Sequence, residues 1–371
     1  MSLDVTAFTD TYLPTVNGIT YTIDLWQSRW NDRYGRVDVV YPEAEGYEPR
    51  EFEYPVQSIG VPFYREHRLG RPSTPTDLSP SDIVHLHSPF TMGLAGLRYA
   101  NRIDVPTVAS YHTILAERVD RFVTAPSVSA VCQRACHRYE KGFYDAVDLV
   151  TTPTPSARRY VQRQISPDTE IRVVSNGIDI RLFRPVDPSD LKSRYGIDSQ
   201  QPLVGYTGRH SPEKRLSELI EATAGMDVTL VLGGDGPSRR TLEAHAEAVD
   251  CEAVFLGFLD RSEVPAFYSM LDVFAFPGRI ETQGLVALEA NACGTPVVAV
   301  DRGALAHTVV DGQTGYHYPP GDIAAFSTAI ERTITEAGRL RDNCLRRREL
   351  VSVQHTLNQL RVLYERLLTD Q

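Results

Sequence analysis

Two glutamates eight positions apart, Glu281 and Glu289, flank Gly284 between two apolar runs, an order that predicts a strand, a loop and a helix. Glu281 is expected in the loop, where its carboxylate suits the hydroxyls of a sugar. Gly284 and Leu285 are expected to begin the helix, whose free N–H groups suit phosphate oxygens. Glu289 lies one turn further on, where its carboxylate suits the vicinal diol of a ribose. Alternatively, both glutamates are surface carboxylates near a helix N-terminus, where negative charge is favourable by about 0.3–1 kcal/mol.

The stretch "GYTGRHSPEKR" runs from an apolar strand into a helix and carries two cations, Arg209 and Lys214. The pair suits a diphosphate, because arginine grips two oxygens at once and lysine acts as a movable point charge. A solvated loop with incidental basic residues is the alternative.

Two more turns of the same half contain glycine, at Gly234 in "LVLGGDGP" and at Gly257, which Phe258 follows. Glycine lets the backbone turn tightly and approach a ligand. A flat base is expected to fit beside Gly257 and Phe258. Neither turn is specific alone, because tight turns between strands and helices need glycine in any case.

The first half of the chain offers a counterpart. Gly18 precedes the helix-like residues 19–27, so the N–H groups of Gly18 and Ile19 are expected to reach an anion. His112 ends an apolar run, which places it at the carboxyl end of a strand, beside a ligand site. A structural hydrogen-bonding role for His112 is the alternative. His85 and His87 alternate along another strand, where packing or orienting roles are expected.

Short apolar runs alternate with helical patterns along the whole chain, which indicates βαβ units and parallel sheets of the α/β class. We expect two doubly wound, Rossmann-like domains at residues 1–178 and 179–350, with a linker at 184–190. Open α/β sheets bind ligands at the carboxyl ends of their strands, so the two domains are expected to face each other across a cleft. Residues 351–371 have helical leucine spacing and are expected to cross back onto the first domain.

Composition limits the partners. The net charge of −10 argues against a general nucleic-acid binder. Five cysteines without paired spacing, no signal peptide and no apolar run of about 18 residues favour a cytoplasmic protein with reduced thiols. Cys132, Cys136 and His137 lie close together, but a zinc site needs four ligands, so no metal is expected there.

The stretch "VCQRACHRYEKGFYDAV" at 131–147 has the spacing of an amphipathic helix. Arg134, Arg138 and Lys141 fall on one face, which suits anionic lipid headgroups at the inner face of a membrane. An ordinary packed helix with a solvated face is the alternative.

These pieces in this order resemble the retaining glycosyltransferases of family 4, which have the two-domain B-type fold. The resemblance is carried by the two glutamates, "EANACGTPVVAV", "TDTYLPTVNG", "DIVHLHSPF", "VASYHT", "VVSNGIDIRLFRP" and "GRHSPEKR", and it spans nearly the whole chain. It implies transfer of a hexose from a UDP- or GDP-linked sugar with retention at the anomeric carbon. It implies no cofactor, and the absence of a two-aspartate motif favours a metal-independent reaction.

The resemblance also implies roles in the second domain. Arg209 and Lys214 correspond to the family's pair on the donor diphosphate. Glu281 corresponds to the glutamate near the hydroxyls of the donor sugar, and Glu289 to the one on the ribose.

Further roles follow by the same match. Gly284 and Leu285 correspond to the amides on the phosphates, and Gly18 to a glycine of the first domain near the diphosphate. His112 corresponds to a histidine beside the sugar, and Asn176 to the "NG" turn between the domains.

Three positions depart from the family pattern and put the loop shapes and donor preference in doubt. Asn17 stands where the family often has a first glycine, Gln283 where it often has phenylalanine, and Arg215 where glycine is usual.

The acceptor is the open question. The segments "TDTYLPTVNG" and "SYHT" look most like the branch that glucosylates diacylglycerol-type lipids, so a membrane lipid or glycolipid is the favoured acceptor. A soluble sugar, a sugar phosphate or a growing glycan is the alternative. A nucleotide-sugar-binding module without turnover is the non-enzyme alternative.

Overall fold

The computed structural model describes residues 2–61, 64–119, 125–198 and 200–370, and it contains two compact units. The first unit comprises residues 1–177 together with 353–371, and the second comprises residues 178–352. The stretch 184–190 lies inside the second unit and not between the units, so the predicted linker is wrong. Phe183, directly before this stretch, is fully buried, and Val186 N donates to Ser269 Oγ (3.1 Å), which fixes the stretch to its own unit.

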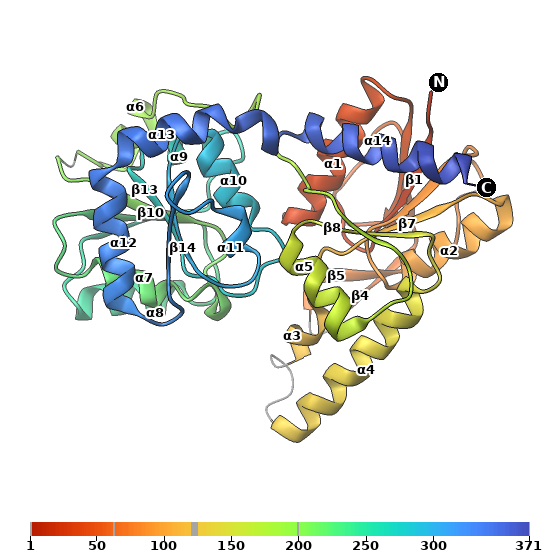
Figure 1. Cartoon of the computed structure of the whole chain (residues 1–371), viewed down its shortest axis with the longest axis horizontal. Helices are drawn as coiled ribbons and strands as arrows, with labels where there is room; N and C mark the ends of the chain where they lie inside the picture. Colours follow the sequence, from red (N-terminus) through yellow and green to blue (C-terminus); the bar gives the residue numbers. More distant parts are fainter. Residues whose placement is uncertain (1, 62–63, 120–124, 199, 371) are drawn as a thin grey trace. The chain divides into compact units, whose positions relative to one another are not determined.

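The first unit is built on a seven-stranded parallel sheet with the order β3-β2-β1-β6-β7-β8-β9 (Figure 1). Strands on both sides of β1 give the doubly wound order of Rossmann-like folds. The strands are β1 (Val5–Phe8), β2 (Val37–Pro42), β3 (Glu53–Val56), β6 (Ile83–Leu86), β7 (Thr107–Ser110), β8 (Leu149–Thr152) and β9 (Ile171–Val173). A separate antiparallel hairpin pairs β4 (Ser58–Val61) with β5 (Tyr64–Gly70).

Helices cover both faces of this sheet. Side chains alternate along β2, so Val39 and Tyr41 enter one core and Val40 enters the other. The helical segments are α1 (Gly18–Asn31), α2 (Thr91–Ile103), α3 (Leu115–Val119), α4 (Pro126–Tyr144), α5 (Pro155–Tyr160), the π-helix η1 (Val161–Ile165) and α14 (Val353–Thr369).

The C-terminal helix α14 returns to the first unit, as its leucine spacing predicted. Leu357, Leu360 and Tyr364 are buried in the core that also contains Trp30 of α1. The Tyr364 and Trp30 rings lie 5.4 Å apart. The face that α14 covers is therefore the face that α1 covers.

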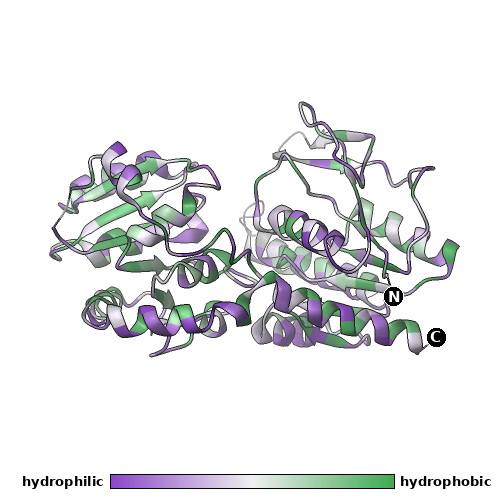
Figure 2. Cartoon of the chain, turned by 90° about the horizontal axis from the view of Figure 1, so that it is seen from above, coloured by the Kyte–Doolittle hydropathy of each residue, from purple (hydrophilic) through white to green (hydrophobic). Residues whose placement is uncertain are grey.

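The second unit has a six-stranded parallel sheet with the order β12-β11-β10-β13-β14-β15. In Figure 2 the strands of both units are mostly coloured as hydrophobic, as expected for sheets covered on both faces. The strands are β10 (Leu203–Thr207), β11 (Thr229–Gly233), β12 (Ala253–Gly257), β13 (Val273–Phe276), β14 (Val297–Val300) and β15 (Gly315–Tyr318). The helices are α6 (Ser189–Arg194), η2 (Pro212–Lys214), α7 (Leu216–Thr223), α8 (Arg239–Ala248), α9 (Val264–Met270), α10 (Leu285–Ala292), α11 (Leu305–Thr308), α12 (Ile323–Thr335), α13 (Ala337–Arg346) and η3 (Arg348–Val351).

Within the described residues, no helix combines the length and the apolar character that crossing a bilayer requires.

Candidate active site

Three loops at the carboxyl edge of the second sheet are tied together by backbone hydrogen bonds. Gly234 N donates to Gly257 O (2.6 Å), and His210 N donates to Asp235 O (2.8 Å). Gly234 has φ +99°, and a Cβ atom there would lie 2.0 Å from the carbonyl oxygen of Gly208. Gly234 is therefore required for this backbone contact, and the loops after β10, β11 and β12 form one rigid edge.

His210 holds the loop that carries Arg209, although no sequence pattern selected this histidine. The His210 side chain is fully buried, and its Nε2 lies 3.1 Å from the carbonyl oxygen of Gly233. Burial lowers the pKa of His210. Arg209, the preceding residue, is exposed at the sheet edge. A buried neutral histidine beside an exposed arginine thus anchors the loop while the cation faces solvent.

Lys214 and Glu281 come together as an ion pair, although 67 positions separate them. Both side chains are largely buried, at 21% and 18% exposure. Burial acts to lower the pKa of Lys214, but the charge of Glu281 outweighs it and the pKa is raised. Lys214 Nζ also lies 5.7 Å from the centre of the Phe276 ring. The lysine is therefore a fixed positive charge, here neutralised by Glu281.

Helix α10 begins at the predicted glycine. Gly284 adopts the left-handed conformation at φ +79°, and no described side chain caps this end of the helix. A Cβ atom at Gly284 would lie 2.7 Å from Leu305 Cδ2 and 3.2 Å from Phe276 Cε1. The Phe276 ring thus adjoins both the helix N-terminus and Lys214. Uncapped N–H groups and a nearby ammonium group form an arrangement that suits phosphate oxygens.

Glu289 lies in the second turn of α10, as predicted, but its carboxylate is already engaged. Arg261 forms an ion pair with Glu289 Oε1 (2.8 Å), and Tyr268 OH donates to Oε2 (3.0 Å). The side chain is only 4% exposed. Arg261 in turn lies 4.6 Å from the centre of the Phe183 ring. A ribose can reach Glu289 only if Arg261 moves, a condition that the sequence did not indicate.

Gly257 ends the strand β12 at the same edge, and Phe258 follows it. Gly257 has φ +75°, a conformation that glycine adopts without strain. Phe258 is 64% exposed, which is unusual for a phenylalanine and leaves its ring available to a flat ligand.

The backbone at Arg215 explains why the family usually has glycine at this position. Arg215 has φ +52° at the start of α7, in the left-handed region that glycine favours. Its Nε donates to Glu218 Oε1 (2.6 Å), and Arg279 also pairs with that oxygen (2.7 Å).

In the first unit, the predicted anion site at α1 is only partly available. Asn17 Oδ1 accepts from Ile19 N (2.9 Å) and Thr20 N (3.0 Å), so the Ile19 amide, which was expected to reach an anion, is already engaged. Gly18 is exposed at the first position of the helix. The asparagine that replaces a family glycine therefore caps the helix itself.

His112 belongs to a stack of three histidine rings. His87 Nδ1 lies 3.0 Å from His112 Nε2, and the rings are stacked at 5.3 Å. His85 stacks on His87 at 4.3 Å and contacts Tyr364 OH and Ser110 Oγ. The packing and orienting roles expected for His85 and His87 are what these contacts provide.

These three histidines are held in their neutral form. Burial lowers the pKa of His85 to about 3 and that of His112 to about 4. Burial also lowers the pKa of His87 well below its ordinary value. A neutral His112 can donate or accept a hydrogen bond at a substrate hydroxyl, but it supplies no fixed charge.

Asn176 is buried, and its carbonyl oxygen accepts from Trp26 Nε1 of α1 (2.7 Å). Gly177 follows at φ +71°, where a Cβ atom would lie 2.7 Å from Val353 Cα. This "NG" turn is thus fixed between α1 and the start of α14.

The predicted basic face on α4 is reduced. Arg134 and Arg138 are exposed, but Lys141 Nζ pairs with Asp145 (3.0 Å) and Asp168 (3.1 Å). Figure 1 shows α4 extending outward from its sheet, with α3 beside it. Val128, Val131 and Tyr139 of α4 are large exposed apolar or aromatic side chains.

No group of three or more histidine, cysteine, aspartate or glutamate side chains that could hold a metal ion occurs within the described ranges. His137, which lies near Cys132 and Cys136, instead contacts Tyr160 OH through Nε2 (3.0 Å).

Comparisons with known proteins cover most of the chain. Residues 188–348 match the family model of glycosyl transferases group 1, and residues 16–182 match that of Glycosyltransferase Family 4. A GDP-mannose-dependent alpha-mannosyltransferase of Mycobacterium tuberculosis is 31% identical over 71% of this chain and 65% of its own length, which is just under two thirds. An alpha-monoglucosyldiacylglycerol synthase of Streptococcus pneumoniae is 27% identical over 85% of this chain and 76% of its own.

A solved structure supports the same assignment of the fold. The sucrose-phosphate synthase of Thermosynechococcus elongatus has a TM-score of 0.78 over 100% of both chains at 21% identity, a likeness that concerns the fold alone. With both family models matched in sequence order and two Rossmann-like units present, the chain belongs to glycosyltransferase family 4.

Proposed function

We propose that this glycosyltransferase moves a hexose from a nucleoside diphosphate sugar to an acceptor hydroxyl, with retention and without a metal ion. The observation that carries the proposal is the Lys214–Glu281 ion pair beside the uncapped N-terminus of α10. Both features surround Phe276 at the carboxyl edge of the second sheet. The name of one relative, which depends on GDP-mannose, supports a GDP-linked donor, and the name of another, a glucosyl lipid synthase, supports transfer of a hexose.

The chemistry follows from charge development. As the bond between sugar and phosphate breaks, the leaving diphosphate gains negative charge, and fixed positive groups at that position lower the barrier. Removing one such donor costs about 3–4 kcal/mol in well-studied enzymes. Lys214 and Arg209 would supply the charge, and the amides of Gly284 and Leu285 would supply hydrogen bonds.

The ion pair allows an exchange of partners when the donor binds. A diphosphate that takes Lys214 releases Glu281, whose carboxylate can then accept from hydroxyls of the donor sugar. The acceptor attacks from the face that the diphosphate leaves, and the departing phosphate takes the proton of the acceptor hydroxyl. No side-chain nucleophile is needed in this sequence of events.

Other contacts complete the proposed donor site. The base lies on the exposed ring of Phe258 beside Gly257 and the Gly234 turn. The ribose binds Glu289 after Arg261 has moved. From the first unit we assign His112 to a sugar hydroxyl, the Gly18 amide to the diphosphate, and Asn176 to the donor through its turn.

The test is a panel of nucleotide sugars with release of the nucleoside diphosphate as the readout. Arg209→Ala and Lys214→Ala should each lower turnover about 100- to 1,000-fold, the range seen when one transition-state donor is lost. Lys192→Ala on α6 is the matched control, because it removes the other lysine of this unit and should leave turnover unchanged. Near-normal turnover in both site variants would refute the proposal, and wild-type protein that releases no diphosphate would favour a binding module.

We favour a membrane lipid or glycolipid as the acceptor. On α4, exposed Val128 and Val131 accompany Arg134 and Arg138, a combination that suits an anionic lipid surface. Lys141 contributes little, because two aspartates pair with it. Flotation with anionic and neutral vesicles tests this, and binding to anionic vesicles should fall in Arg134→Glu/Arg138→Glu. Absence of binding to either vesicle would favour a soluble sugar, a sugar phosphate or a growing glycan.

A further inference from the structure

A pocket of about 430 Å³ lies at the end of β2 in the first unit, and no residue assigned above lines it. This volume is within the range of small-molecule sites, roughly 300–1,000 Å³. Its walls come from the end of β2, the loop that follows, β3 and β5. The lining residues used below are Tyr41, Glu43, Glu45, Tyr47, Pro55 and Arg68, which we call the Tyr41 pocket.

Tyr41 is the first sign of a ligand. Its side chain is 1% exposed, and its hydroxyl oxygen is buried with no hydrogen-bond partner in the described part of the chain. A buried polar group left without a partner costs about 1–3 kcal/mol. Tyr12 holds the Tyr41 ring in place at 4.7 Å between ring centres. Tyr41 thus lines the pocket, and its hydroxyl lacks a hydrogen-bond partner within the described chain.

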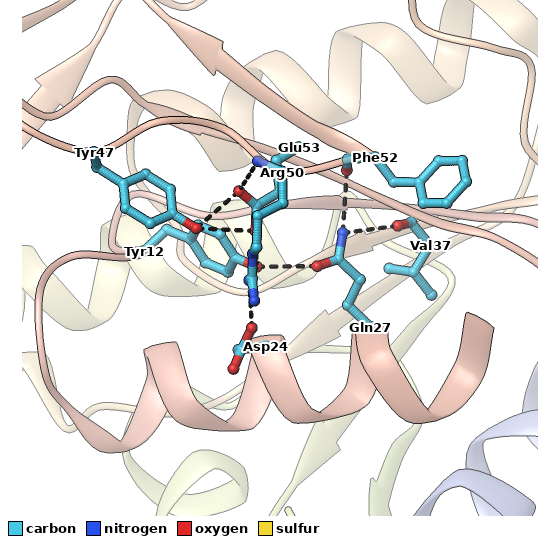
Figure 3. A network of polar contacts seen from close by, with 8 residues as sticks. All are labelled: Tyr12, Asp24, Gln27, Val37, Tyr47, Arg50, Phe52 and Glu53. Carbon is cyan, nitrogen blue, oxygen red and sulfur yellow. Dashed lines mark hydrogen bonds and ion pairs between the residues drawn. The ribbon is translucent and has the colours of Figure 1, made fainter. Parts of the chain in front are cut away.

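The second wall is rigid before any ligand arrives. Figure 3 shows Glu53 at the centre of a polar network, where its carboxylate accepts from Tyr47 OH (2.9 Å), Arg50 N (2.9 Å) and Tyr12 OH (3.0 Å). Arg50 also pairs with Asp24 of α1. The network fixes Tyr47 and the loop after β2 onto the helix, and a preorganised wall lowers the entropy cost of binding.

Backbone strain accompanies this network. Phe52 has φ +66°, which costs a residue with a Cβ atom about 1–2 kcal/mol. Gln27 Nε2 donates to the Phe52 carbonyl oxygen (3.1 Å), as Figure 3 shows. Val39 N donates to the same oxygen (2.9 Å), and the two bonds hold this conformation. Strained residues cluster where the surrounding structure must hold a precise geometry. Here the strain directs Glu53 into the network that supports Tyr47.

The charges of the pocket select the chemistry of the ligand. Glu43 and Glu45 contribute two carboxylates and Arg68 one guanidinium, which donates to Ser58 Oγ (2.7 Å). The local charge is negative, so a phosphate group is disfavoured. Carboxylates accept from hydroxyl groups, and aromatic rings pack against the C–H faces of a sugar ring. We propose that the Tyr41 pocket binds a neutral sugar or cyclic polyol unit of the acceptor.

The position of the pocket constrains the acceptor. Tyr41 lies on β2 and His112 follows β7, three strands away in the order β2-β1-β6-β7. Neighbouring strands lie about 4.8 Å apart, so the two sites are separated by roughly 14 Å along the sheet edge. The bound unit is thus distinct from the hydroxyl that receives the hexose, and this assignment to an acceptor rests on the proposed function. Binding energy from such a remote unit can be used to orient the reacting group.

Binding of methyl α-D-mannopyranoside and methyl α-D-glucopyranoside to the full chain, titrated by saturation-transfer NMR, tests the proposal. Tyr41→Phe removes only the unpartnered hydroxyl and should weaken binding at least fivefold. Tyr318→Phe is the matched control, because Tyr318 is equally buried at 1% exposure and its hydroxyl also lacks a partner in the described chain, but it belongs to the second unit. Binding should be unchanged in this control.

Three outcomes overturn the proposal: neither glycoside binds the wild type, Tyr41→Phe binds as tightly as Tyr318→Phe, or glucose 6-phosphate binds as tightly as the neutral glycosides. The measurement needs no donor turnover. Wild-type protein that binds a glycoside but releases no nucleoside diphosphate contradicts the proposed function alone. Wild-type protein that turns over a donor but binds no glycoside contradicts the pocket alone.

Discussion

The carboxyl edges of the two sheets present the same elements with opposite outcomes. Each edge has a helix N-terminus next to a glycine, α1 at Gly18 and α10 at Gly284. At α1 the Asn17 side chain accepts from two amides, whereas at α10 no described side chain caps the helix. The first helix has two of its N-terminal amides engaged by Asn17, whereas no described side chain accepts from the N-terminal amides of the second.

Charge divides the two edges in the same way. The first edge holds His85, His87 and His112 in neutral form, while the second holds the charged Lys214–Glu281 pair. The carboxyl end of a parallel strand therefore offers a ligand site. Whether the ligand is an anion depends on fixed charge and on helix N–H groups that no side chain caps. We expect the largest loss of stability at the buried neutral histidines of the first edge.

Low pH should destabilise the protein through the neutral histidines of the first edge. The folded-state pKa values of His85 (about 3) and His112 (about 4) lie below the ordinary 6.5, so the unfolded chain binds more protons between these values. Stability must then fall as pH falls through that window, by up to about 1.4 kcal/mol per pH unit for each such histidine. Urea denaturation at pH 7, 5.5 and 4.5 measures the fall.

His85→Gln is the variant that isolates this effect, because it removes one titrating group from the stack. It should be less stable than the wild type at pH 7 and should lose less stability between pH 6.5 and pH 4.5. Equal losses in the two proteins over that interval would show that the histidines are not the acid-sensitive element.

Gly284→Ala should damage the charged edge. The left-handed conformation costs alanine about 1–2 kcal/mol, and the clash with Leu305 Cδ2 at 2.7 Å adds a repacking cost of about 1 kcal/mol. The free energy of unfolding should fall by about 2–3 kcal/mol, and nucleotide-sugar turnover should fall with it. Gly338→Ala in α13 is the control, since no described atom lies within 4 Å of its Cβ position and alanine should stabilise that helix by about 0.5–1 kcal/mol. Gly284→Ala with unchanged stability would mean that the turn does not require glycine.

Much of this fold could be predicted from local pattern. Continuous apolar runs mark strands of the two sheets, and the leucine spacing of α14 placed it on the first unit. The linker was wrong because Pro and Asp at 184–190 signal a turn but not which unit it packs against; the contact from Val186 to Ser269 spans 83 positions. The strands β3 (EYPV) and β15 (GYHY) were missed, since neither is a continuous apolar run.

Sequence predicted those site residues that can be recognised from their local sequence order. Lys214, Glu281 and Gly284 were selected from local order, and the structure brings the first two into contact. Arg261 and His210 were not, because their importance comes from partners distant in sequence, Glu289 and Gly233. The Asn17 cap was the opposite case: Asn before a helix is a known capping signal, and the family pattern directed attention to glycine instead.

Asn17 gives the smallest and most specific test of the comparison. Asn17→Ala should lower the free energy of unfolding by about 1 kcal/mol, since it removes the acceptor of the Ile19 and Thr20 amides. Asn17→Gly should cost only a few tenths of a kcal/mol, because glycine is an acceptable cap residue. Urea denaturation ranks the wild type and the two variants by their free energy of unfolding. The KM for the nucleotide sugar shows whether the cap also affects binding of the donor. If the freed amides at Asn17→Gly lower this KM, then the cap alone had kept the first edge from holding an anion. If both variants match the wild type in stability, the cap hydrogen bonds do not hold this helix and the contrast between the two edges fails at its starting point.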